Sequence, residues 1–77
     1  MWHVYFNFPY MEELGHGFDT LAEAIKAIES GSISKWNIEI VSDSFGIGGR
    51  HIVVWNLNLK KWVNKRTGST IEQEGWV

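Results

Sequence analysis

FDTLAEAIKAIESG, residues 18–31, carries the clearest helical pattern in this chain of 77 residues. Its larger apolar side chains follow the i, i+3, i+4, i+7 spacing that places them on one face of an α-helix. These side chains are Leu21, Ala24, Ile25 and Ile28. We therefore predict a helix over about residues 20–30. So short a helix is not stable alone in water, and its apolar face is expected to pack on a sheet.

Both ends of this helix have capping residues. Thr20 can accept a hydrogen bond from the third helical amide, and Glu23 can reach back, as in a capping box. Asp19 is an alternative N-cap, and its charge suits the positive end of the helix dipole. Gly31 is placed to end the helix in the left-handed conformation.

Four other segments are predicted as β-strands, three from residues that share a face at every second position and the last because a hairpin turn is predicted near residues 58–60. They are residues 2–8, 36–42, 51–57 and 61–65. Residues 14–18 are either part of a loop or a short strand, which could pair back on the first strand as a hairpin. Otherwise the first two strands would be joined through the helix by a right-handed crossover. The tail, residues 70–77, is read as a last short strand or a frayed end.

These segments predict a single α+β domain spanning residues 1–77. We expect two layers, with one helix on a mainly antiparallel sheet of three to four strands, in the order β-α-β-β-β. A chain of this length buries only about 60% of its unfolded surface, so the core is thin. The sequence holds no cysteine, so no disulfide can reinforce that core.

Composition and charge narrow the classes of function. The absence of cysteine, of a basic, apolar leader and of 18 consecutive apolar residues favours a cytoplasmic protein without a membrane partner. The net charge is −2, too small for a strong nucleic-acid binder. It is unevenly spread: residues 1–47 hold two lysines against seven acids, and residues 48–77 hold five cations against two acids. The C-terminal half is expected to carry a basic surface.

No motif predicts catalysis, a metal or a cofactor. His3, His16 and His51 lack the spacing of metal ligands, and no nucleophile or zincin pattern is present. The glycine-rich residues 45–50 resemble a phosphate loop only superficially, because they lie between two predicted strands and lack the following Lys-Ser/Thr. We expect a non-enzymatic protein, without catalytic, cofactor-binding or metal-binding residues.

The best candidate for binding is the basic, aromatic segment of residues 60–66. A tryptophan among cations suits a protein interface or the stacking of a nucleic-acid base. Its alternative role is structural, with the tryptophan laid over the core and lysines keeping the hairpin soluble. Apolar residues of the preceding loop could add contacts or fold back on the sheet edge. The predicted partner-binding residues are Lys60, Lys61, Trp62, Lys65, Arg66, Phe45, Ile47 and Arg50.

Five tryptophans are shared between core and surface in this prediction. Trp36 and Trp55 alternate with the core faces of their strands and are assigned to the core, as Trp2 is. Trp76 either closes a sheet edge or has no role. Trp62 is assigned to the exposed hairpin face, so its loss should spare the fold, whereas the loss of Trp36 or Trp55 should cost about 3–5 kcal/mol.

A strand, then FDTLAEA (residues 18–24), then a hairpin ending in Lys61-Trp62-Val63, resembles small β-α-β-β proteins of phages and bacteria. Some small phage-encoded inhibitors of host defence are similar in outline. This resemblance is one of architecture; it implies an accessory or inhibitor protein and assigns no site.

Taken together, the sequence predicts an interaction module that binds a protein partner or itself through the hairpin face. The alternative is single-stranded nucleic-acid binding through Trp62 and residues 60–66. A third reading is a nucleotide or small molecule bound between subunits.

Overall fold

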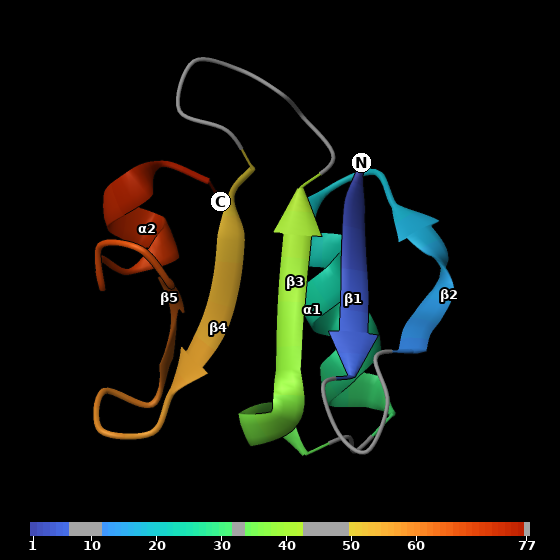
Figure 1. Ribbon diagram of the computed structural model, residues 1–77, viewed down its shortest axis with the longest axis horizontal. Coiled ribbons are helices and arrows are strands. Elements are labelled where there is room, and N and C mark those ends of the chain that lie inside the picture. The colour runs from blue at the N-terminus through green and yellow to red at the C-terminus, as the bar shows by residue number, and fades with distance from the viewer. Residues whose placement is uncertain (7–11, 32–33, 43–49, 77) are drawn as a thin grey trace.

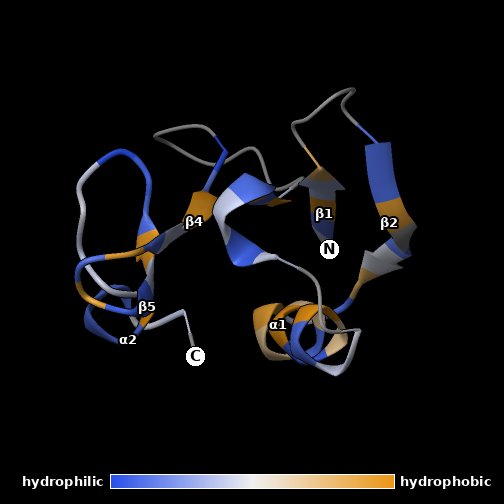
Figure 2. Cartoon of the chain, turned by 90° about the horizontal axis from the view of Figure 1, so that it is seen from below, coloured by the Kyte–Doolittle hydropathy of each residue, from blue (hydrophilic) through white to orange (hydrophobic). Residues whose placement is uncertain are grey.

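The computed structural model describes residues 1–6, 12–31, 34–42 and 50–76, which form an α+β fold. Both helices lie on one side of the sheet (Figures 1 and 2). The elements are β1 (Trp2–Phe6), β2 (Glu12–Phe18), α1 (Leu21–Ser30), the 3-10 turn η1 (Lys35–Asn37), β3 (Ile38–Ser42), β4 (Ile52–Asn56), β5 (Lys61–Asn64) and α2 (Ile71–Glu74).

The strands form one antiparallel sheet in the order β2-β1-β3-β4-β5, and α1 crosses behind β1 and β3 (Figure 1). This arrangement confirms the predicted α+β class, with one main helix and a mainly antiparallel sheet. The predicted number of three to four strands and the order β-α-β-β-β are wrong. An additional strand, β2, precedes α1, and a short helix, α2, follows β5.

The chain opens with a β-hairpin, which was one of the two openings compatible with the sequence. Val4 pairs with Leu14 of β2 on one side and with Ile40 of β3 on the other, both in antiparallel register. A right-handed parallel crossover therefore does not occur. The β1–β2 register shifts near Gly17, whose φ of +95° favours glycine. A Cβ there would lie only 2.8 Å from Met1 Sδ.

Helix α1 confirms the predicted span. Thr20 is the N-cap, and its Oγ1 accepts a hydrogen bond from the Glu23 amide at 3.1 Å. At the other end, the Gly31 amide donates to the Ala27 carbonyl at 3.1 Å. Gly31 has φ −82°, so the predicted left-handed cap is wrong. Among the described residues, neither α1 nor the shorter α2 has the length and apolarity to cross a bilayer.

The core lies between the helices and the sheet, and it includes residues from both halves of the chain. Its buried members are Val4, Leu21, Ala24, Ile28, Ile38, Ile40, Val53, Trp62 and Ile71. Burial of one such aliphatic side chain contributes roughly 1.5–3 kcal/mol before conformational entropy is considered. Trp2, Trp55 and Trp76 are partly buried against this cluster.

Trp36 is not a core residue, contrary to the prediction. Residues 35–37 form the turn η1, so the strand alternation begins only at Ile38. Without that alternation Trp36 does not share the face of Ile38 and Ile40, and 66% of its surface is exposed.

The tail forms the helix α2 where a strand or a frayed end was predicted. Thr70 and Gln73 form a complete capping box, and Gly75 ends the helix in the left-handed conformation at φ +74°. Ile71 is buried in the core, so four helical residues suffice to fix the C-terminal segment against β5. Thr70 also forms an isolated antiparallel bridge with Val63, which covers part of the outer edge of β5.

Candidate functional site

The β4–β5 hairpin divides the predicted basic segment between its two ends. Lys60 and Lys61 lie at the turn, whereas Lys65 and Arg66 follow the last residue of β5. At the usual rise of a strand, the four residues of β5 separate these pairs by roughly 13 Å. Residues 60–66 are therefore not one continuous patch.

The turn of the hairpin is organised by Asn56. Its Oδ1 accepts hydrogen bonds from the amides of Asn58 at 2.9 Å and Leu59 at 2.8 Å. Its backbone carbonyl accepts from the Lys60 amide at 2.8 Å. Lys60 adopts φ +55°, a left-handed conformation that costs a non-glycine residue about 1–2 kcal/mol. The turn is thus closed by backbone groups and one asparagine side chain.

Trp62 is buried, so its predicted place on an exposed hairpin face is wrong. Only 5% of its surface is accessible, and its ring packs edge-on against Trp55 with the centroids 5.3 Å apart. The register causes this, because Trp62 pairs with Trp55 and so shares the helix-covered face of Val53. Trp62 Nε1 has no hydrogen-bond partner within the described structure.

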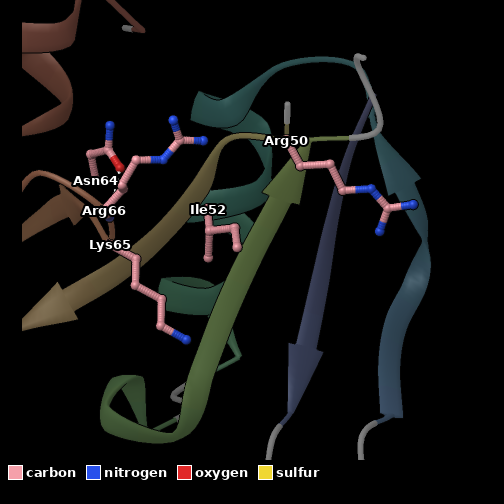
Figure 3. A pocket seen from close by; sticks show the side chains of 5 residues that line it. All are labelled: Arg50, Ile52, Asn64, Lys65 and Arg66. Carbon is pink, nitrogen blue, oxygen red and sulfur yellow. Dashed lines mark hydrogen bonds between the residues drawn. The ribbon is translucent and has the colours of Figure 1, made fainter. Parts of the chain in front are cut away.

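A hollow of about 360 Å³ lies at the end of β4 and β5 that is remote from the turn. Arg50, Ile52, Asn64, Lys65 and Arg66 line it (Figure 3). Figure 3 shows Arg66 reaching towards β4 and Lys65 reaching along the sheet, with the Arg50 guanidinium turned away from both. Three of the predicted partner-binding residues, Arg50, Lys65 and Arg66, line this one hollow, which we call the basic hollow.

A second hollow of about 240 Å³ adjoins the first and shares Arg50, Asn64 and Arg66 with it. It adds two aromatic residues, His51 and Trp76, whose ring centroids are 4.5 Å apart. Trp2 extends this cluster, with its ring centroid 6.0 Å from that of Trp76 and 6.4 Å from that of His51. Aromatic surface therefore adjoins the cations.

Asn64 holds the chain around both hollows. Its Oδ1 accepts from the Arg66 amide at 2.9 Å, and its Nδ2 donates to Glu74 Oε1 at 3.3 Å. Thr67 Oγ1 donates to the same carboxylate oxygen at 3.1 Å. The Gly68 amide closes the turn by donating to the Asn64 carbonyl at 2.8 Å. This network links the segment after β5 to α2 and fixes the backbone from which Arg66 extends.

Carboxylates moderate the positive charge of the basic hollow. Lys65 Nζ lies 3.1 Å from Glu39 Oε2, and the lysine side chain is 53% exposed. Solvent screens such a pair, which contributes about 0–1 kcal/mol to stability. Glu74 lines the second hollow, where its Oε1 already accepts two hydrogen bonds. Three cationic side chains and one carboxylate, that of Glu74, are among the described residues that line the two hollows.

The other predicted residues lie apart from the hollows or outside the described residues. Lys60 and Lys61 are exposed at the turn end, and Phe45 and Ile47 lie outside the described residues. His51, Asn64 and Trp76 line the second hollow but were not among the predicted partner-binding residues. The run Asn64-Lys65-Arg66-Thr67-Gly68 is typical of an asparagine-capped turn and could have indicated Asn64. No local signal joins residues 51 and 76, which meet only through the fold.

Among the described residues, no three His, Cys, Asp or Glu side chains are grouped so that they could hold a metal ion. Arginine and lysine at the basic hollow can bind carboxylates or phosphates through charge-assisted hydrogen bonds.

Comparison with known proteins gives no relative: no protein-family model, no curated protein and no solved structure matches the chain significantly.

Proposed function

We propose that this domain is a non-enzymatic interaction module that binds an acidic segment of a protein partner at the basic hollow. The observation that carries the proposal is that three cationic residues, Arg50, Lys65 and Arg66, line one hollow of about 360 Å³. Cations grouped in this way attract an acidic partner and orient it on approach. A cytoplasmic location and an accessory or inhibitor role of the phage or bacterial kind stay predictions.

Two features support this site, one of them its preformed backbone and the other its charge. Asn64 and Glu74 fix the chain segment that carries Lys65 and Arg66, so part of the ordering cost is met before binding. The hollow also lies on the C-terminal half of the chain, where cations exceed acids.

Fluorescence anisotropy with a labelled Glu-rich peptide tests this proposal. We expect binding at low salt that weakens at high salt. Arg66→Glu should lower the affinity about tenfold, because it reverses a charge that lines both hollows. Lys26→Glu, an equal charge reversal on the exposed face of α1, should change the affinity less than about twofold. No binding at low salt, or equal losses in the two variants, would overturn the proposal.

A second candidate, single-stranded nucleic-acid binding, is favoured by one observation. His51 and Trp76 place aromatic surface beside Arg66, the combination that stacks bases and holds phosphates. Trp62, the stacking residue that the sequence suggested, is buried and not placed for this role. A labelled oligothymidylate that binds more tightly than the Glu-rich peptide, and that loses affinity in His51→Ser, would favour this candidate over the first. The third reading, a small molecule bound between subunits, stays a prediction.

A further inference from the structure

The turn end of the β4–β5 hairpin carries exposed apolar side chains that the core does not explain. Trp36 is 66% exposed, Leu57 68% and Leu59 53%. Among the described residues only one other large hydrophobic residue, Met1 at 50%, is comparably exposed. The turn η1 and the β4–β5 turn lie at the same end of the sheet, the lower end in Figure 1. This grouping differs from the single exposed leucines that are normal on protein surfaces.

The two leucines are not required by the geometry of the turn. Asn56 closes it by accepting amide hydrogen bonds from Asn58 and Leu59, and neither leucine side chain belongs to the core cluster. Polar residues at positions 57 and 59 would make the same backbone hydrogen bonds. The leucines are therefore presented outward from a defined turn.

Trp36 is likewise presented from an anchored segment. Its neighbour Lys35 places Nζ 4.0 Å from the centroid of the Trp55 ring and 3.6 Å from Glu29 Oε1. These contacts tie η1 to β4 and α1. The exposed indole of Trp36 thus projects from a segment that is fixed to the body of the domain, as a binding anchor requires.

Cations accompany this apolar surface. Lys60 and Lys61 are exposed next to Leu59, and neither forms an ion pair with a residue in the described part of the chain. Apolar anchors with lysines beside them match a ligand that combines apolar side chains with carboxylates. A second copy docked here by a two-fold axis would bring the lysines of both copies together, which disfavours that occupant.

We propose that Trp36, Leu57, Leu59, Lys60 and Lys61, the hairpin-end surface, dock an acidic amphipathic segment of a partner protein. Its apolar side chains contact Trp36 and the two leucines, and its carboxylates pair with the lysines. The surface lies at the opposite end of β5 from the basic hollow. The proposal does not rest on that hollow.

Selection from a random peptide phage library on the immobilised domain tests this surface without a known partner. The selected peptides should combine Leu, Ile, Phe or Trp with Asp or Glu. By calorimetry, Leu57→Asn/Leu59→Asn should weaken the best peptide about tenfold or more, and Lys60→Glu/Lys61→Glu by a similar factor. Lys26→Glu and Arg66→Glu should each change the affinity less than about twofold. Thermal melts check that all variants fold.

Nuclear magnetic resonance places the bound peptide independently. The indole Nε1–H signal of Trp36 should shift when the peptide is added, while that of buried Trp62 should stay nearly unchanged.

Four results would overturn the proposal. The first is a set of selected peptides that bind wild type and Leu57→Asn/Leu59→Asn equally. The second is a consensus without acidic residues. The third is sedimentation showing a dimer that Leu57→Asn/Leu59→Asn dissociates, since the occupant would then be a second copy. Loss of binding only in Arg66→Glu would assign the peptide to the basic hollow instead and would equally reject this surface.

Discussion

The two ends of the β4–β5 hairpin hold their exposed side chains in different ways. At the end near Asn64, side chains bond to one another, as in the Asn64–Glu74 and Lys65–Glu39 contacts, and three cationic residues line a hollow. At the turn end, the backbone closes on Asn56, and apolar side chains face outward. Trp62 lies between these ends and faces the core. A short hairpin with a buried centre can thus present two separate surfaces of different chemistry.

Replacing the buried centre should have the largest effect. Trp62→Ala removes a core side chain and leaves a cavity, which should cost about 3–5 kcal/mol, as much as so small a core supplies. Trp36→Ala, the matched control on the exposed surface, should change stability by less than about 0.5 kcal/mol. Urea denaturation of both variants measures this. Equal losses of stability in the two variants would contradict the burial of Trp62 between the two ends of the hairpin.

The side-chain network of the basic hollow should be the next most sensitive feature. Asn64→Ala removes an acceptor for the Arg66 amide and a donor to Glu74, at a cost of about 1–2 kcal/mol. Asn58→Ala, at the turn end, should cost less than about 0.5 kcal/mol, because only the backbone amide of Asn58 takes part in the turn. Thermal denaturation compares the two. A smaller loss in Asn64→Ala would contradict the network.

The backbone of the turn predicts a gain in stability. Lys60→Gly relieves the left-handed conformation at φ +55° and, after the entropic cost of glycine, should stabilise the domain by about 0.5 kcal/mol. Lys61→Gly, one residue later in β5, should instead destabilise it by about 0.5–1 kcal/mol. The midpoints of denaturant unfolding, compared where the denaturant slope is unchanged, give the sign of each change in stability. The same sign in both variants would show that the turn is not closed as described.

The ion pair beside the basic hollow should have the smallest effect. A double-mutant cycle of Lys65→Ala and Glu39→Ala should give a coupling energy of about 0.3 kcal/mol, since the lysine is half exposed. That coupling should fall further at high salt. A salt-independent coupling above about 1 kcal/mol would mean that the pair is shielded from solvent and holds the hollow more firmly than its exposure implies.

Local signals predicted part of this fold well. The cap at Thr20 and the apolar stripe of α1 are encoded within one segment, so the helix was found at its observed span. The same kind of signal is present at Thr70, Gln73 and Gly75, but α2 has only four residues and shows no stripe. A helix that short can be recognised only by its capping residues. The prediction of a strand or a frayed end for residues 70–77 did not take those residues into account.

The tryptophans show why the site was predicted only in part. Alternation assigns a residue to a face only if the strand is continuous and its register is known. Trp36 falls in η1, outside the strand, and the four-residue turn sets the register that pairs Trp62 with Trp55. The prediction therefore placed Trp36 in the core and Trp62 on the surface, and the structure shows the reverse. The cations of the basic hollow were identified by charge, whereas Trp76 joins them only through tertiary packing.

The solvent exposure of the five indole N–H groups tests the division of the hairpin most directly. Paramagnetic relaxation by a soluble gadolinium chelate, with signals assigned by single Trp→Phe variants, measures it in one experiment. We predict that Trp36 Nε1–H is strongly broadened and that Trp62 Nε1–H is the least affected of the signals from described residues. Broadening of Trp62 equal to that of Trp36 would contradict a buried residue between two separate surfaces.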